Sequence, residues 1–218
     1  MKSATPPSLR RFASLVLVGI LTVVLAACTG RGGGYLPPGA SLGTNVLPQA
    51  LFPGTVFTGQ ASFGFSFSCE DKGGVNPPTG QLHIELAYTD HGTSLPVGAP
   101  FSIHGIVDKI DPVLESAICI GQNPPPGGNE LIFLGRYRQV SGSAGIFPST
   151  CPTRETPTSS LCRFEVIVRD NDGNLAPSKG DLFSIKLSGA TAVTSEIDPA
   201  KVFYARAGFL AGGNLTVR

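Results

Sequence analysis

Residues 61–68 read ASFGFSFS and carry the clearest structural pattern in the chain. Phe63, Phe65 and Phe67 alternate with glycine and serine. Successive side chains of a β-strand point to opposite faces of a sheet, so this alternation places the rings on one face and small polar groups on the other. The segment predicts a half-buried strand of an antiparallel sheet.

The same two-residue period recurs along the chain. Apolar and polar residues alternate over 82–89, 163–169 and 183–188, and further strands are predicted at 101–110, 114–120, 130–140, 201–205 and 213–217. Turn-forming stretches such as NPPTG, NPPPGGN and DNDGN separate them. With no 3.6-residue period after Ala27, the pattern predicts an all-β domain: an antiparallel sandwich or barrel of about eight to nine short strands. Alternation alone does not choose between sandwich and barrel.

Composition excludes several classes of protein. The 218 residues include 28 Gly and 19 Pro, which rules out a long helical bundle. Lys and Arg number 16 against 15 for Asp and Glu, and only 14% of residues are charged. The chain therefore lacks the basic stripe of a nucleic-acid-binding protein, and we expect no nucleic-acid partner.

The N-terminus has the pattern of an export signal. Lys2, Arg10 and Arg11 precede an uncharged apolar stretch at 12–27. As a helix that stretch would span about 24 Å, which is short of the ~30 Å hydrocarbon core of a bilayer. A cleaved signal peptide explains it better than a permanent membrane helix.

The leader ends in Leu25-Ala26-Ala27-Cys28, which resembles the lipobox of bacterial lipoprotein precursors. The resemblance implies cleavage before Cys28, a diacylglycerol thioether on its sulfur and an acyl chain, such as palmitate, on its amino group. Several acyl chains hold a protein firmly on a membrane. We therefore expect a lipoprotein of the cell envelope that faces outside the cytoplasm, with the membrane as its partner and no cofactor besides the lipid.

These features divide the chain into three parts: a lipoprotein signal peptide at 1–27, a lipidated Cys with a Gly/Pro-rich tether at 28–54, and a single β domain at 55–218. Gly-rich and Pro-rich segments typically act as linkers. The alternative for the tether is that Leu47, Leu51 and Phe52 pack on the domain as its first strand.

Four cysteines remain after Cys28, and export makes disulfides their expected state. Cys69, Cys119, Cys151 and Cys162 allow three connectivities. Cys151 and Cys162 bracket a Pro/Thr/Ser-rich loop, which favours their pairing, and elimination then pairs Cys69 with Cys119. A four-cysteine zinc site needs two close pairs, and the wide spacing here does not supply them.

One weak candidate for a metal site lies between two predicted strands. A hairpin there would bring His91 and His104 together with Asp90, and two imidazoles with a carboxylate suit zinc. The structural alternative is that His91 caps a turn and His104 fills a half-buried sheet position.

A calcium loop is a second weak candidate. Asp170, Asp172 and Asn174 have the spacing that opens such a loop, but Leu175 stands where glycine is required. A hairpin turn explains the Asn171-Asp172-Gly173 segment better. No G-x-S-x-G nucleophile elbow and no phosphate-binding glycine loop with a following helix is present, so nothing argues for an enzyme.

Five phrases in a fixed order carry a second resemblance. They are YTDH at 88–91, IHGIV at 103–107, CRF leading into VRDNDG at 162–173, KGDLFSI at 179–185 and GFLAGGNL at 208–215. From about residue 63 to 217 the chain resembles the post-choice-of-anchor domains, small β modules of exported bacterial proteins. That resemblance implies a β fold and an extracytoplasmic location, and a cysteine pair before the 162–169 strand is common in the family. It implies no specific activity.

Two functional hypotheses follow. The first is a lipid-anchored cell-envelope protein whose disulfide-linked β domain has a structural, adhesive or binding role, with its protein or glycan partner unidentified. The second is a metal-dependent or carbohydrate-directed binding protein or hydrolase that uses the region of His91, His104 and Asp90. The two differ in whether these three side chains converge in a cavity.

Overall fold

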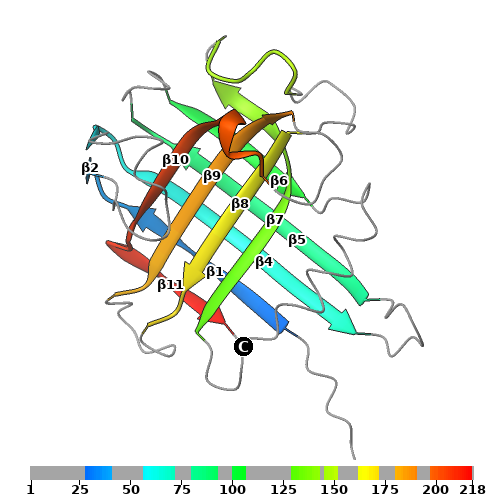
Figure 1. Cartoon of the computed structure of the whole chain (residues 1–218). Coiled ribbons are helices and arrows are strands. Elements are labelled where there is room, and N and C mark those ends of the chain that lie inside the picture. The colour runs from blue at the N-terminus through cyan, green and yellow to red at the C-terminus, as the bar shows by residue number, and fades with distance from the viewer. Residues whose placement is uncertain are drawn as a thin grey trace, which may run out of the picture.

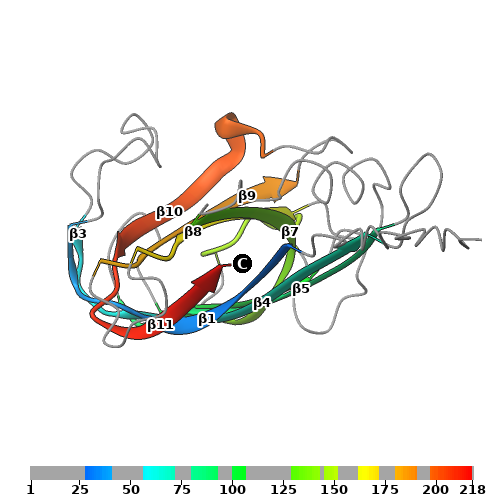
Figure 2. The ribbon, with the colours of Figure 1, turned by 90° about the horizontal axis from the view of Figure 1, so that it is seen from below.

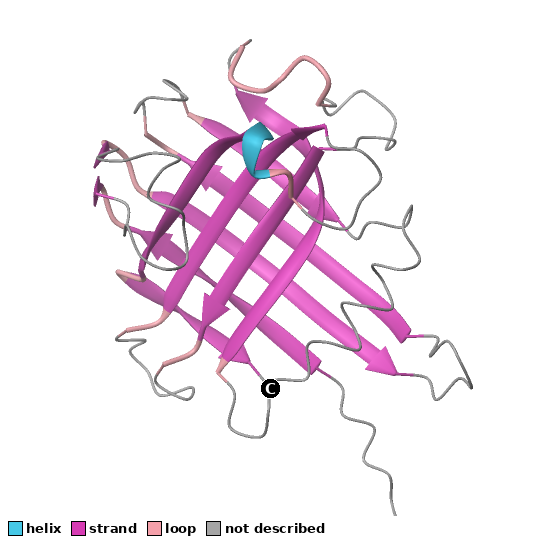
Figure 3. Cartoon of the chain, in the orientation of Figure 1, coloured by secondary structure: helices cyan, strands magenta, loops and turns pink. Residues whose placement is uncertain are grey.

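The structure is a computed structural model of the whole chain. It describes residues 28–40, 56–71, 80–92, 100–106, 129–142, 145–151, 162–171, 180–190 and 197–217. Strands dominate these ranges, and a single turn of 3-10 helix, η1 (Pro199–Lys201), accompanies them (Figure 3).

Nine of the described strands form one antiparallel sheet, in the order β10-β9-β8-β7-β6-β5-β4-β1-β11. Their bounds are β1 (Cys28–Leu36), β4 (Ala61–Asp71), β5 (Gly80–Asp90), β6 (Phe101–Ile106), β7 (Glu130–Gly142), β8 (Cys162–Arg169), β9 (Leu182–Ala190), β10 (Val202–Phe209) and β11 (Gly212–Val217). The short strands β2 (Gly39–Ala40) and β3 (Val56–Phe57) pair separately.

The sheet curls on itself into a half-barrel, so that β8, β9 and β10 cross over β1, β4 and β5 (Figures 1 and 2). The prediction of an all-β antiparallel fold is confirmed. The architecture is neither of the two predicted ones in full: one continuous curled sheet replaces the two separate sheets of a sandwich, and its end strands β10 and β11 are not paired with each other as in a closed barrel.

Aromatic rings fill the space between the two walls of the half-barrel. Phe63 of β4 stacks on Phe183 of β9, with ring centroids 3.7 Å apart and planes at 13°. Phe65 and Phe67 both pack against Phe133 of β7. The alternating rings of residues 61–68 therefore face the core as predicted, where a fully buried Phe contributes about 1.5–3 kcal/mol.

The first part of the predicted tether forms a strand. Residues 28–36 form β1, which lies between β4 and β11 inside the sheet. Residues 41–55, which include the predicted packing residues Leu47, Leu51 and Phe52, lie outside the described ranges, as does the predicted strand at 114–120.

Glycine explains why β1 has no strand pattern in the sequence. A Cβ atom at Gly32 would lie 2.6 Å from the carbonyl oxygen of Asn214, and one at Gly30 would overlap the side chain of Leu131. Other strands approach β1 so closely that these positions require glycine. The alternation of apolar and polar residues that marks the other strands is therefore missing here.

At the outer edge of β11, where the curled sheet ends, aspartate side chains accept hydrogen bonds from backbone amides. Asp181, just before β9, accepts a hydrogen bond of 3.1 Å from the amide of Leu215. Asp170, just after β8, accepts one of 3.4 Å from the amide of Val217. Side chains thus bond to backbone donors that a further strand would otherwise have to satisfy.

Candidate functional site

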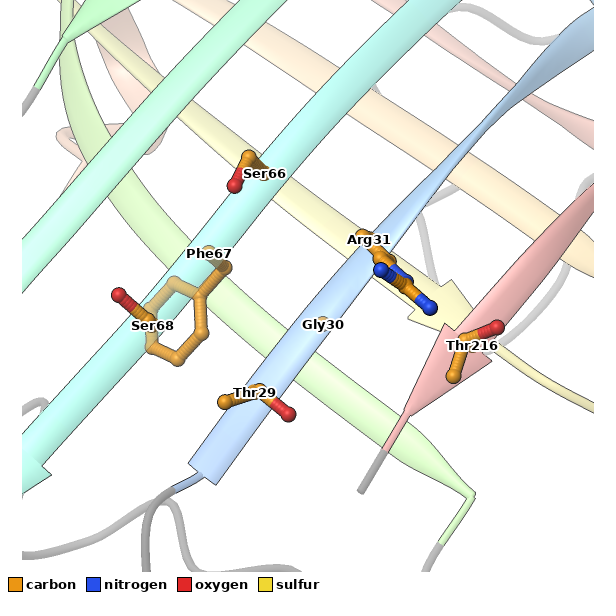
Figure 4. Close-up of a pocket in the computed structure, with 7 residues that line it drawn as sticks. All are labelled: Thr29, Gly30, Arg31, Ser66, Phe67, Ser68 and Thr216. Atoms are coloured by element: carbon orange, nitrogen blue, oxygen red, sulfur yellow. The ribbon is translucent and has the colours of Figure 1, made fainter.

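A polar pocket lies on the outer face of the sheet across β4, β1 and β11 (Figure 4). Its volume is 330 Å³, at the lower end of the range for ligand sites. The residues that line it are Thr29, Gly30, Arg31, Ser66, Phe67, Ser68 and Thr216.

The residues that line this pocket come from three segments that are far apart in the sequence and that strand pairing places side by side. Arg31 of β1 lies directly opposite Ser66 of β4 on one side and Thr216 of β11 on the other. Thr29 lies opposite Ser68. Directly opposed side chains in an antiparallel pair have Cβ atoms about 4.5–5.5 Å apart, so four hydroxyl groups and one guanidinium line the same pocket.

Short side chains create the hollow. The outer face of β4 carries only glycine and serine over residues 62–68, because its bulky partners in the alternation, such as Phe67, point into the core. Arg31 is exposed and stands among these small residues. The sequence signal for this surface was the polar half of ASFGFSFS, but the strand that supplies Arg31 was not predicted.

Arg31 has no carboxylate partner within the described ranges. The nearest candidate by register is Glu85 of β5, which follows Ser66 in the same row. Two strand spacings of about 4.8 Å separate the backbones of Arg31 and Glu85, and the structure has no ion pair between them. Among the described residues that line the pocket, Arg31 is therefore the one that carries a formal charge.

The structure does not bring the predicted metal-site residues together. Asp90 faces the core and pairs with Arg206, whereas His91 is exposed and its Nε2 lies 3.1 Å from the Oγ of Ser62. His104 is on the outer face of β6, opposite Ala87. His91 follows the end of β5 and is four residues from Ala87, or about 13 Å along an extended chain, so the two histidines lie at different levels of the sheet.

Among the described residues no three His, Cys, Asp or Glu side chains could hold a metal ion. The candidate residues His91, His104 and Asp90 therefore do not form such a group, because Asp90 faces the core and pairs with Arg206. In the calcium candidate, Asp170 accepts the amide of Val217, and residues 172–179 lie outside the described ranges.

Asp90 instead belongs to a buried polar network that the sequence did not predict. Its Oδ2 accepts hydrogen bonds from the hydroxyl of Tyr204 and, at 2.9 Å, from Nη1 of Arg206. The Tyr88 and Tyr204 hydroxyls are 2.5 Å apart. Arg206 also donates to the carbonyls of Pro37 (2.9 Å) and Gly59 (2.8 Å), and lies 4.4 Å from the ring centroid of Phe57.

The side chains of this network are buried, and burial is the main influence on the pKa values of its tyrosines. Desolvation raises the pKa of Tyr88 and of Tyr204 well above the ordinary value of 10, and the negative charge of Asp90 acts in the same direction. Burial alone would lower the pKa of Arg206, but Tyr88, Tyr204 and Asp90 together raise it. The network therefore holds one fixed ion pair and two neutral phenols, an arrangement that supports the fold rather than proton transfer.

One predicted disulfide lies within the described residues and is confirmed. Cys151 and Cys162 are bonded, with Cα atoms 5.5 Å apart, as predicted. The hydroxyl of Tyr137 donates to the carbonyl of Ser188 at 2.9 Å and lies 3.3 Å from the Sγ of Cys151. The disulfide is consistent with an extracytoplasmic location.

The backbone of Cys69 raises a question about its predicted pairing with Cys119. Cys28 and Cys69 are direct partners in the register of β1 with β4. Cys119 lies outside the described ranges, so its pairing with Cys69 stays a prediction.

In the part of the chain that the structure describes, no helix has the length and apolar character needed to span a membrane. No protein-family model, no curated protein and no solved structure matches this chain. The resemblance to post-choice-of-anchor domains stays a prediction on the five quoted phrases.

Proposed function

We propose that this chain is a lipid-anchored protein of the cell envelope, in which the β half-barrel is a structural or adhesive module outside the cytoplasm. The observation that carries the proposal is Leu25-Ala26-Ala27-Cys28 at the end of a charged and then apolar leader. The Cys151–Cys162 disulfide supports an oxidising location.

Strand β1 changes what such an anchor would do. Because β1 begins at Cys28, a lipid on this residue would be attached to the sheet itself rather than to a linker. Three residues of β-strand cover only about 10 Å, so the end of the sheet that includes Thr29 and Arg31 would lie against the bilayer surface. The proposed role is therefore a rigid module held flush with the membrane, not one displayed at a distance from it.

The register of Cys28 with Cys69 makes the anchor sharply testable. Direct partners in an antiparallel pair have Cα atoms about 4.5–5.5 Å apart, which is within the range that a disulfide spans. A sulfur that carries a thioether cannot also form a disulfide. Lipidation of Cys28 and a Cys28–Cys69 disulfide therefore exclude each other.

The experiment is metabolic labelling with a fatty-acid probe, followed by mass spectrometry of the mature chain and of peptides digested without reduction. We expect label on the mature chain, an N-terminal peptide that begins with diacylglyceryl-Cys28, and loss of both label and membrane association in Cys28→Ser. Cys69→Ser is the matched control and should keep the label. An unlabelled mature chain, or a peptide in which Cys28 is linked to Cys69, would overturn the anchor.

A further inference from the structure

We infer that the pocket around Arg31 binds a phosphate group, supplied either by an anionic lipid headgroup or by free phosphate. The pocket offers only side-chain groups, because the backbone of β1 is hydrogen-bonded on both sides to β4 and β11. Those groups are one guanidinium and the hydroxyls of Thr29, Ser66, Ser68 and Thr216.

This set of groups suits an anion with several acceptor oxygens. A guanidinium presents five N–H donors in a planar fork that matches phosphate oxygens, and each hydroxyl can turn its proton toward an acceptor. Phosphate can use the fork and still accept from the surrounding hydroxyls, whereas a single carboxylate has only two oxygens. The volume of 330 Å³ also accommodates more than a bare carboxylate.

Charge within the pocket favours the same ligand. Arg31 has no carboxylate partner in the described ranges, so a bound anion would not have to displace one. Glu85, two strands away in the same row, is the acidic side chain that lies closest by register on this face of the sheet, and the residues that line the pocket include no carboxylate.

Position relative to the anchor points to a lipid headgroup as the source, an assignment that rests on the proposed lipidation of Cys28. Arg31 and Cys28 are three residues apart on β1, or about 10 Å. The polar headgroup layer on each side of a bilayer is roughly 5–8 Å thick. A sheet fixed to the membrane at Cys28 would thus hold the pocket at the level of the lipid phosphates.

The test uses the mature chain with Cys28→Ser, which carries no lipid, so its outcome does not depend on whether Cys28 is acylated. The probes are dihexanoyl-phosphatidylglycerol below its micelle concentration and inorganic phosphate, each titrated against sodium chloride of equal ionic strength. Amide and guanidinium NMR shifts report binding, and we expect them to change at Thr29, Arg31, Ser66 and Thr216.

Three further variants, made in the Cys28→Ser background, identify the site. Arg31→Gln should weaken binding at least tenfold, and Thr216→Val should weaken it less, because it removes one hydroxyl at nearly constant shape. Lys201→Gln is the matched control, since it removes the same charge from an exposed site on η1, and it should bind as before. Binding of the short-chain lipid identifies a headgroup as the source, and binding of inorganic phosphate alone identifies free phosphate.

The proposal is overturned if neither probe shifts these resonances at millimolar concentration. It is equally overturned if Arg31→Gln binds as well as its parent, or if Lys201→Gln weakens binding as much as Arg31→Gln does. An unchanged NMR spectrum elsewhere in the sheet verifies that each variant is folded, which we expect for Arg31→Gln because the side chain of Arg31 is exposed.

Discussion

Arg206 and Asp90 form an ion pair inside the half-barrel, with Nη1 and Oδ2 2.9 Å apart and side chains only 2% and 4% exposed. The two residues are 116 positions apart in the sequence, on β10 and at the end of β5. Their contact joins one wall of the curled sheet to the other.

Removing one partner of this pair should strongly destabilise the protein. We expect Arg206→Met to lower the free energy of unfolding by about 3–5 kcal/mol, because it would leave the buried Asp90 without its ionic partner. Lys186→Met is the control, since the Lys186–Glu165 pair is more exposed and contributes ~1 kcal/mol or less. Urea denaturation measures both, and equal losses would show that the buried pair has no special role.

Alkaline pH should unfold the protein through its buried tyrosines. Burial raises the pKa of Tyr88, Tyr137 and Tyr204 above the ordinary value of 10, so these phenols stay protonated in the folded state when they would ionise in the unfolded chain. Their contribution to the free energy of unfolding is complete below pH 10. Above pH 10 it is lost at about 1.4 kcal/mol per pH unit for each tyrosine.

Stability measured from pH 9 to 11 tests this expectation. Tyr137→Phe removes one of these phenols, so the free energy of unfolding should fall less steeply with pH, by about 1.4 kcal/mol per pH unit. Tyrosinate absorbance from all four tyrosines at a pH where circular dichroism still reports a folded sheet would contradict it.

Two glycines that look alike in the sequence should respond differently to alanine. A Cβ at Gly105 would lie 2.5 Å from Cε1 of Phe164, whereas one at Gly64 would meet its nearest atom, the carbonyl oxygen of Gly32, at 4.0 Å. We expect Gly105→Ala to cost about 1–3 kcal/mol through overpacking and Gly64→Ala to cost nothing. Thermal unfolding of the two variants compares them, and equal melting temperatures would argue against the close packing of β6 on Phe164.

The Cys151–Cys162 disulfide should stabilise the protein chiefly by restricting the unfolded chain. A loop of this size corresponds to about 3 kcal/mol in the chain-entropy description. The double variant Cys151→Ala/Cys162→Ala should lose stability of that order in urea, and the reduced protein should match it. A variant as stable as its parent would mean that tertiary contacts alone fix this loop.

Several features could be read from the sequence because their signal is local. Strands β4, β5, β8 and β9 show their two-residue period within a few consecutive residues, and the pairing of Cys151 with Cys162 follows from their bracketing of one loop. These elements were predicted at nearly their observed bounds.

Other features depend on residues that meet only after the sheet has formed. Strand β1 has glycine where alternation would have revealed it, because its neighbours Asn214 and Leu131 leave no room for a side chain. Asp90 is a weak candidate metal ligand in the sequence, because its partner, Arg206, lies on a distant strand.

Local alternation is thus sufficient to predict an antiparallel β domain, since each strand carries its own buried and exposed faces in its side chains. The curl of the sheet, the place of β1 between β4 and β11, and the pocket around Arg31 arise from register between segments far apart in the chain. No short window of sequence encodes that register, because it is set by which strands can pack together as a whole.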